Sequence, residues 1–126
     1  MRSVPGRTAP KPKYNPRMSD CIFCKIATGE IRVGAVFQDD QCIVFPDIDP
    51  KAPTHLLVIP RQHFATAAHA PEPILGHLVT TATSVAKEKL PDGYRIVINT
   101  GDDGGQTVHH LHLHLLGGRA MHWPPG

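Results

Sequence analysis

The C-terminal part of the chain contains three histidines that alternate with leucines, in the stretch His110-Leu111-His112-Leu113-His114-Leu115-Leu116. Because successive side chains of a β-strand point to opposite faces, a strand here presents three imidazoles on one face and leucines on the other. The leucine face has to be buried, and a solvated histidine run would not need leucine at every intervening position. The pattern therefore predicts a site that is built into a sheet.

Length and composition indicate one globular domain. The chain has 126 residues, of which 40% are hydrophobic and 19% are charged, which is typical of a soluble domain with a single core. The longest apolar runs have the length of a strand, so we expect no membrane span. We find no signal segment and three cysteines, two of them as Cys21-x-x-Cys24. This combination predicts a cytoplasmic protein whose cysteine pair binds a metal or takes part in redox chemistry.

Residues 1–18 differ in composition from the rest of the chain. They contain four prolines and five basic residues but no acidic residue, so we expect a disordered tail ahead of one domain at residues 19–126. The whole chain has thirteen basic and eleven acidic residues, and the tail holds five of the basic ones. The domain itself is therefore mildly acidic, and a basic surface for nucleic acid is not expected.

The order of periodic segments predicts an α+β fold with an antiparallel sheet. A fully apolar run after His55 is typical of a central strand that is buried on both faces, and Cys42 is expected as a small buried residue. Leucine, isoleucine, valine and alanine recur at helical spacing after Pro73. The predicted elements are a short helix capped by Asp20 and ending at Thr28-Gly29, a hairpin of residues 33–38 and 42–45, a strand over 55–60, a short helix over 61–70, a long helix over 73–90 and a strand over 94–99.

Three neighbouring imidazoles can divide the tasks of nucleophile and proton donor, since their pKa lies close to neutral pH. The glycine-rich loop 101–105 precedes them and offers backbone N–H groups, with Asn99, Gln106 and Thr107 beside it. Such a loop can bind a phosphate in a nest of N–H groups, although it is not a P-loop because no Gly-Lys-Ser/Thr follows. A nucleophilic histidine beside an anion nest predicts phosphoryl or nucleotidyl transfer through a phospho-histidine intermediate.

A metal site is the main alternative. Alternating histidines on a strand can present two imidazoles to zinc, and three can hold a catalytic ion. The spacing of Cys21 and Cys24 favours a zinc chelate over a redox pair, because no βαβ pattern follows. Two further ligands are needed, and His63 and His110 are the preferred candidates, since the first follows a core strand and the second begins the run. Such a closed Cys₂His₂ site would be structural and would leave the other two histidines of the run free.

The histidine run matches the His-φ-His-φ-His-φ-φ signature of the histidine triad (HIT) family at every position, and the chain resembles a member of that family over residues 20–126. It is most similar to the nucleoside phosphoramidase branch, often called HINT, and the Cys-x-x-Cys opening resembles bacterial members that keep a zinc site. The segments that carry the likeness to this branch are Asp47-Ile48, residues 53–60, Asp103-Gly104-Gly105-Gln106 and the ending from Gly117 to Gly126.

The resemblance implies a fold and an activity. The fold is α+β, with a five-stranded antiparallel sheet, one long helix and short helices, in a homodimer whose sheet continues across both subunits. The activity is hydrolysis of purine nucleoside 5′-monophosphoramidates, of the AMP-amine type, through a covalent nucleotidyl-histidine. Two alternatives stay open, a dinucleoside polyphosphate hydrolase, which the ending Trp123–Gly126 disfavours, and a nucleotide-binding adaptor with incidental catalysis. Neither nucleic acid nor a membrane is an expected partner.

The resemblance also implies roles for individual residues. His112 is the nucleophile, His114 bonds phosphate oxygens and assists the leaving group, and His110 supports His112. The matches to phosphate binders are Asn99, Gln106 and Thr107, the last in place of the branch's usual serine. The matches to the nucleoside pocket are Ile22, Phe23, Ile26, Phe45, Asp47, Ile48 and Leu57, with Asp47 on the ribose hydroxyls. The implied zinc ligands are Cys21, Cys24, His63 and His110, with His55 as the alternative fourth ligand.

Overall fold

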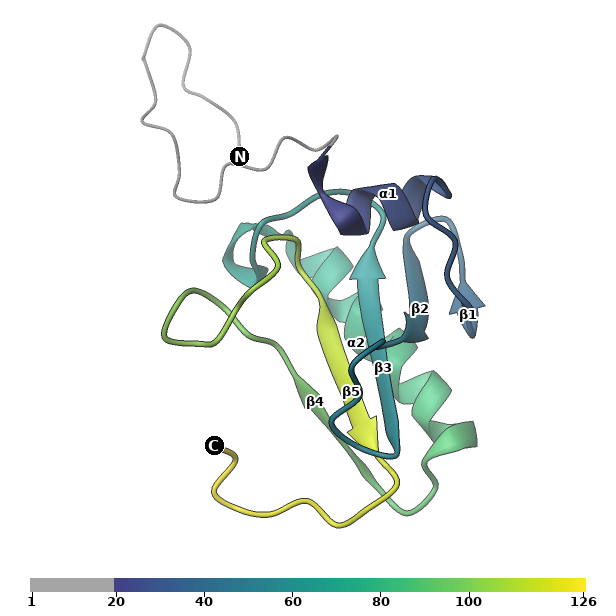
Figure 1. Cartoon of the computed structure of the whole chain (residues 1–126), viewed down its shortest axis with the longest axis vertical. Coiled ribbons are helices and arrows are strands. Elements are labelled where there is room, and N and C mark those ends of the chain that lie inside the picture. Colours follow the sequence, from purple (N-terminus) through teal and green to yellow (C-terminus); the bar gives the residue numbers. More distant parts are fainter. Residues whose placement is uncertain (1–19) are drawn as a thin grey trace, which may run out of the picture.

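The structure is a computed structural model that describes residues 20–126, so the tail predicted over residues 1–18 lies outside the described part of the chain. The strands form one antiparallel sheet with the order β1-β2-β3-β5-β4. In Figure 1, α2 runs behind this sheet and α1 lies across its upper end. The predicted α+β fold with five antiparallel strands is confirmed. The elements are α1 (Ile22–Thr28), β1 (Phe37–Gln38), β2 (Cys42–Pro46), β3 (Thr54–Pro60), the 3₁₀ helix η2 (Ala67–His69), α2 (Glu72–Lys89), β4 (Tyr94–Val97) and β5 (Leu113–Gly117).

Both faces of the sheet are covered, and alternate residues of each strand serve different faces. On the α2 side, Val58 of β3 and Leu113 of β5 pack in one apolar cluster with Leu78 of the helix. On the α1 side, Leu57 and Ile59 of β3 pack in a second cluster that includes residues of α1. Because β3 contributes to both clusters, every one of its residues after Thr54 is buried, which confirms the predicted central strand.

The long helix α2 begins one residue before the predicted Pro73 and ends where Leu90 caps it. Not every residue of the predicted apolar stripe is buried, since Val79 is 40% exposed. Within residues 20–126, no helix combines the length and the apolarity that crossing a membrane requires. Leu78, Ala82 and Val85 of α2 pack in the apolar cluster on one face of the sheet.

Arg61 and Asp39 pin the hairpin of β1 and β2 to both helices. The guanidinium of Arg61 donates to the backbone carbonyls of Asp39 and Ala27, each at 2.7 Å. The Asp39 carboxylate accepts the backbone N–H groups of Gln41 and Cys42 at 2.8 Å and lies 2.7 Å from Nε2 of His77 on α2. Cys42 is fully buried, as predicted. These contacts fix the end of the sheet at which α1 lies.

Two of the short helices differ from the sequence prediction. Helix α1 is capped by Cys21 and not by Asp20, because the Cys21 thiol accepts the N–H of Cys24 at 3.4 Å. The helix predicted over residues 61–70 is reduced to η2, which the hydroxyl of Thr66 caps. His63 consequently lies in an irregular segment between β3 and η2. The helix does not reach back to residue 61 because backbone groups there bond to other segments: the N–H of Arg61 to the carbonyl of Gln41, and the carbonyl of Phe64 to the N–H of Leu111.

The strand predicted over the whole histidine run starts later than expected. Strand β5 begins at Leu113, and His110 and His112 precede it. The backbone N–H of Leu111 donates to the carbonyl of Phe64 at 2.7 Å, so this segment bonds to a loop and not to a neighbouring strand. The alternation of side chains nevertheless persists, because the run's leucines 111, 113 and 115 are all buried in the α2-side cluster.

Replacement of Leu113 by alanine tests the importance of this cluster. Leu113 is completely buried, so we expect Leu113→Ala to lower the free energy of unfolding by about 2–5 kcal/mol. The control Val79→Ala, at the exposed position of α2, should change it by about 0.5 kcal/mol or less. Chemical denaturation measures both values. Equal losses in the two variants would contradict the assignment of Leu113 to the core.

Candidate functional site

The three histidines of the run lie on the α1 side of the sheet, opposite the leucines. Phe23 of α1 contacts two of them edge-on, with ring centroids 5.7 Å from His110 and 5.1 Å from His112. The rings of His112 and His114 are also 5.1 Å apart. His110 is fully buried and His112 is 7% exposed. The structure thus brings the predicted triad together, although only His114 belongs to a strand.

The ring of His112 has a defined orientation and protonation. Its Nδ1 lies 2.8 Å from the backbone carbonyl oxygen of His110, and because a carbonyl can only accept, Nδ1 carries the hydrogen. Burial lowers the pKa of His112 below its ordinary value, with the hydrogen bond to His110 acting in the opposite direction. The ring is therefore neutral at pH 7, and its Nε2 carries a lone pair. This is the form of imidazole that acts as a nucleophile.

His114 is held by His55, a residue that the sequence prediction did not place among the catalytic ones. The N–H of Lys51 donates to Nδ1 of His55 at 3.0 Å, so the hydrogen of the neutral His55 ring is on Nε2. That nitrogen lies 2.8 Å from Nδ1 of His114 and donates to it. The remaining hydrogen of His114 is then on Nε2, and burial lowers the pKa of His114 to about 4. His114 thus presents an N–H donor.

The position of His55 could have been recognised from parity along β3. His55, Leu57 and Ile59 occupy alternate positions, and the two apolar members pack on the α1 side. His55 therefore points to the same side as the triad, and its backbone is paired with Leu116 of β5. Its Nε2 also lies 3.4 Å from the carboxylate of Asp47. What the sequence lacked was the register between β3 and β5.

A second group of side chains gathers where α1 meets the start of the histidine run. The thiols of Cys21 and Cys24 and the imidazoles of His63 and His110 have their ligand atoms within 4.8 Å of one another. Nδ1 of His110 lies 3.4 Å from the Cys21 sulfur, 3.5 Å from the Cys24 sulfur and 3.1 Å from Nδ1 of His63. The preferred four ligands meet, whereas His55 lies with His114 and not in this Cys/His cluster.

The chemistry of the Cys/His cluster fits a metal ion. Nε2 of His110 donates to the carbonyl of Pro60 at 2.9 Å, which leaves the lone pair of Nδ1 facing both thiols and His63. A backbone carbonyl in this role is typical of a metal-binding histidine. Burial, followed by the contact with Cys21, raises the pKa of the Cys24 thiol to about 12, so a thiolate here needs a compensating cation. Two thiolates and two imidazoles are the donor set of structural zinc sites.

The glycine-rich loop has the tight conformation that its sequence predicts. A Cβ at Gly104 would lie 2.2 Å from the carbonyl oxygen of Thr100, and Gly101 and Gly105 have positive φ angles of 73° and 78°. Asn99 donates through Nδ2 to the carbonyl of Gly104 at 2.7 Å. Only glycine can occupy these positions without strain. The loop is thus a preformed turn next to the triad segment.

Gln106 holds this loop together. Its side-chain nitrogen donates to the carbonyls of Ala65 and Val108 at 2.7 Å and 3.0 Å, and its oxygen accepts the N–H of Gly101 at 3.0 Å. Both amide hydrogens are used, and the residue is buried. Thr107, by contrast, is exposed. The structure therefore shows Gln106 joining the two ends of the loop, and its predicted contact with phosphate stays a prediction.

The residues predicted for a nucleoside pocket divide into two sets. Those that form part of the apolar cluster beneath α1 are Phe23, Ile26, Phe45 and Leu57. Ile22 and Ile48 are 49% and 99% exposed, so they lie at the surface. The carboxylate of Asp47 is partly exposed, accepts the N–H of Asp49 at 2.9 Å and faces His55. The apolar floor and the carboxylate are thus both present on the α1 side.

Known proteins share both the sequence and this architecture. The model of the HIT domain family matches residues 28–121. An uncharacterized HIT-like protein of Synechococcus elongatus is 53% identical over 113 residues, which cover 85% of this chain and 97% of that protein. A 14 kDa zinc-binding protein of Zea mays is 48% identical over 114 residues, which cover 86% of this chain and 89% of that protein.

Among solved structures, a HIT family hydrolase from Legionella pneumophila superimposes with a TM-score of 0.80. It is 48% identical in sequence, and the match covers 84% of this chain and 99% of that one. The family model spans most of the described residues, including the triad and the glycine-rich loop. The chain belongs to the HIT domain family.

Proposed function

We propose that this protein is a hydrolase of purine nucleoside 5′-monophosphoramidates and belongs to the nucleoside phosphoramidase (HINT) branch of the family. The observation that carries the proposal is the pair of neutral rings with opposite tautomers. His112 has a free lone pair on Nε2, and His114 has a hydrogen on Nε2. A nucleophile beside a hydrogen-bond donor is an arrangement that favours displacement at phosphorus. The Legionella relative is itself a HIT family hydrolase.

The proposed reaction has two displacements. In the first, Nε2 of His112 bonds to the α-phosphorus and the P–N bond to the amine breaks, while the Nε2–H of His114 donates a hydrogen bond to the leaving nitrogen and the amine takes its proton from water. In the second, water attacks the nucleotidyl-histidine, the bond from phosphorus to His112 breaks, and the attacking water releases a proton to the solvent. The products are a free amine and a nucleoside monophosphate. Both rings end in their starting protonation states, so the cycle can repeat.

The surroundings of the two rings supply the remaining parts of the reaction. The hydrogen bond from Nδ1 of His112 to the His110 carbonyl stabilises the positive charge that develops on the ring when it becomes bonded to phosphorus. Thr107, which is exposed beside the loop held by Gln106, is available to the phosphate oxygens. The apolar cluster beneath α1 supplies a floor for the base, and Asp47 is available to ribose hydroxyls. These features favour a nucleotide substrate.

Replacement of the nucleophile tests this proposal. We expect His112→Ala to lower kcat for adenosine 5′-monophosphoramidate by about three orders of magnitude or more, because the covalent route is lost. The control His69→Ala removes a histidine whose side chain hydrogen-bonds Thr66, away from the triad, and should keep the wild-type rate. Chromatographic measurement of AMP release gives both rates. A full rate in His112→Ala contradicts the proposal, and faster wild-type turnover of a dinucleoside polyphosphate supports the alternative hydrolase.

We further propose that the Cys/His cluster binds one zinc ion through Cys21, Cys24, His63 and His110. The converging lone pairs and the donor set support this, as does the zinc-binding relative from maize. When bound, zinc would hold both cysteines as thiolates and join α1 to the segments on either side of η2. The site has four protein ligands, so its role is structural.

Metal analysis of purified protein tests the zinc assignment. We expect about one equivalent of zinc per chain, a strong loss in His63→Ala and retention in His55→Ala, since His55 lies outside the Cys/His cluster. The paired variants distinguish the two candidate fourth ligands on one measurement. Loss of zinc in His55→Ala with retention in His63→Ala would reverse the assignment. A wild-type protein with far less than one equivalent would remove the site altogether.

We also propose that two copies form a homodimer through β4, which is an edge strand of the sheet. Tyr94 and Ile98, at the two ends of this edge, are 41% and 37% exposed. An edge strand has unpaired N–H and C=O groups that a second copy can bond, and pairing of two β4 strands would continue the sheet across both subunits.

Light scattering coupled to size exclusion tests the dimer. At micromolar concentration we expect twice the mass of one chain for the wild type and one mass for Tyr94→Asp, since a charge at the paired edge is costly. The control is Phe37→Asp at the opposite edge strand β1, where Phe37 is similarly exposed, at 42%. A monomeric wild type refutes the dimer, and dissociation by Phe37→Asp alone places the interface at the other edge.

A further inference from the structure

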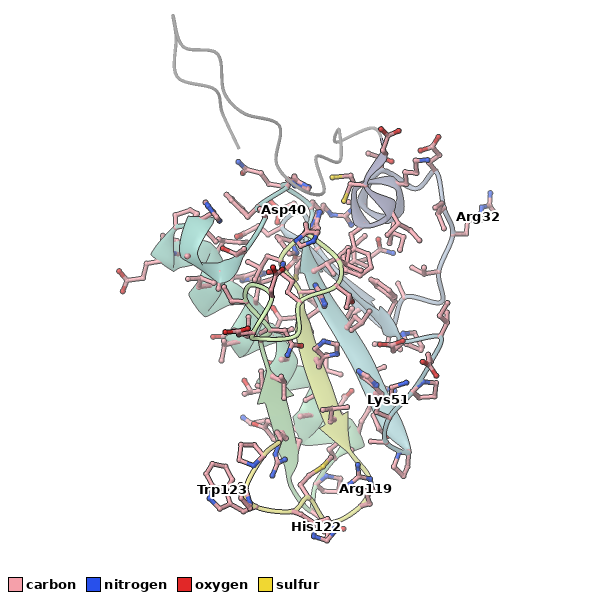
Figure 2. All side chains as sticks on the ribbon, turned by 60° about the vertical axis from the view of Figure 1, so that its left-hand side comes forward. Arg32, Asp40, Lys51, Arg119, His122 and Trp123 are labelled. Atoms are coloured by element: carbon pink, nitrogen blue, oxygen red, sulfur yellow. The ribbon has the colours of Figure 1, made fainter. Side chains whose placement is uncertain are left out.

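The segment that follows β5 contacts the loop that precedes β3. A Cβ at Gly118 would lie 2.9 Å from Cβ of Pro53, so the two backbones approach closely. The next residue, Arg119, donates through one guanidinium nitrogen to the backbone carbonyl of Lys51 at 3.1 Å. Figure 2 shows Arg119 below Lys51, at the end of the molecule where Trp123 and His122 also lie. Two independent contacts thus join the C-terminal segment to the loop.

Lys51, the loop residue that Arg119 contacts, also determines which ring nitrogens of His55 and His114 carry a hydrogen. Lys51 accepts from Arg119 through its carbonyl and donates through its N–H to Nδ1 of His55 at 3.0 Å. That donation keeps the hydrogen of His55 on Nε2, from which it reaches Nδ1 of His114 at 2.8 Å. A continuous series of hydrogen bonds therefore runs from Arg119, through Lys51 and His55, to His114.

The loop has few other attachments on the side of Lys51. Asp49 donates its N–H to the carboxylate of Asp47, and the ammonium of Lys51 contacts the carboxylate of Asp49 at 2.5 Å. Both contacts lie within the loop, whereas the N–H of Asp47 bonds to the carbonyl of His55 at 2.9 Å and ties the start of the loop to β3. Ile48, Asp49 and Lys51 are all exposed. The Lys51 backbone is thus joined to β3 through its N–H to His55 and to the C-terminal segment through its carbonyl to Arg119.

We infer that Arg119 is a positioning residue for the reaction. It touches no substrate and acts by holding the backbone of Lys51, so that the Lys51 N–H keeps His55 in the tautomer that directs the Nε2 hydrogen of His114 toward the leaving group. The inference rests on the proposed function for its kinetic consequence. Its structural part, the control of the His55 tautomer from the C-terminal segment, stands on the hydrogen bonds alone.

A matched control exists in the same segment. Arg95 of β4 donates through its guanidinium to the carbonyl of His122 at 2.7 Å. Like Arg119, it is therefore an arginine that holds the C-terminal segment to another part of the fold. Arg95 does not take part in the series of hydrogen bonds through Lys51 and His55. If Arg119 merely ordered the C-terminal segment, removal of either arginine would have similar effects. If Arg119 positions the catalytic pair, only its removal changes His55 and His114.

The kinetic experiment compares the full-length variants Arg119→Ala, Arg119→Lys and Arg95→Ala with adenosine 5′-monophosphoramidate as substrate. We expect Arg119→Ala to lower kcat about three- to tenfold with KM within about twofold, since the loss of one ordinary hydrogen bond corresponds to about a two- to tenfold change in rate. Arg119→Lys should recover most of kcat because an ammonium can also donate. Arg95→Ala should stay within about twofold. Equal losses in the two alanine variants overturn the inference.

Nitrogen-15 NMR of the histidine side chains supplies a readout that does not depend on turnover. In the wild type we expect the Nε2–H tautomer at His55 and His114, in Arg119→Ala a mixture of tautomers at His55, and in Arg95→Ala the wild-type pattern. An unchanged His55 spectrum in Arg119→Ala overturns the inference, whatever the rates. If the wild type releases no AMP, the proposed function fails, and the NMR comparison alone decides the role of Arg119.

Discussion

The position of His110 is the constraint on which the site depends. Its ring lies in the Cys/His cluster with Nδ1 toward the thiols, and its backbone carbonyl accepts the Nδ1 hydrogen of His112. The segment around it is outside the hydrogen-bonded ladder of the sheet, because β5 begins only at Leu113. It is held by the bonds to Pro60 and Phe64. The residue that closes the proposed metal centre is thus also the residue that orients the proposed nucleophile.

Burial explains why these imidazoles can have fixed and different roles. Burial disfavours the charged form of an imidazole. It therefore lowers the pKa of His112 and of His114, and each ring stays neutral. A neutral ring has one donor and one acceptor nitrogen, and its neighbours decide which is which. The carbonyl of His110 places the hydrogen of His112 on Nδ1, whereas the N–H of His55 leaves the hydrogen of His114 on Nε2. Among the described residues, no buried side-chain nitrogen or oxygen lacks a partner.

Sequence reasoning predicted the faces of the elements better than their ends. The alternation of leucine and histidine assigned both sides correctly, because side-chain parity survives even where the ladder stops, at Leu111. The start of β5 was not predictable, since it depends on a bond to Phe64, distant in sequence. His63 was preferred over His55 as a metal ligand from the sequence alone, but the contact between His55 and His114 was not foreseen, because it depends on the register of β3 and β5. Gln106 was predicted to bind phosphate, and only the structure reveals that its amide is used within the loop.

The separation of the two sheet faces has a consequence for how this chain can change over evolution. The leucines of the run belong to the cluster under α2, and the histidines between them face α1. Exchange of one aliphatic residue for another on the α2 side leaves the imidazoles where they are. Insertion or deletion of a single residue between His110 and His114 reverses the parity of everything beyond it. The leucine positions of the run can therefore change to other aliphatic residues, but the length of the run cannot change. In the exposed ending beyond Gly118, an insertion or deletion does not exchange the two faces of a strand.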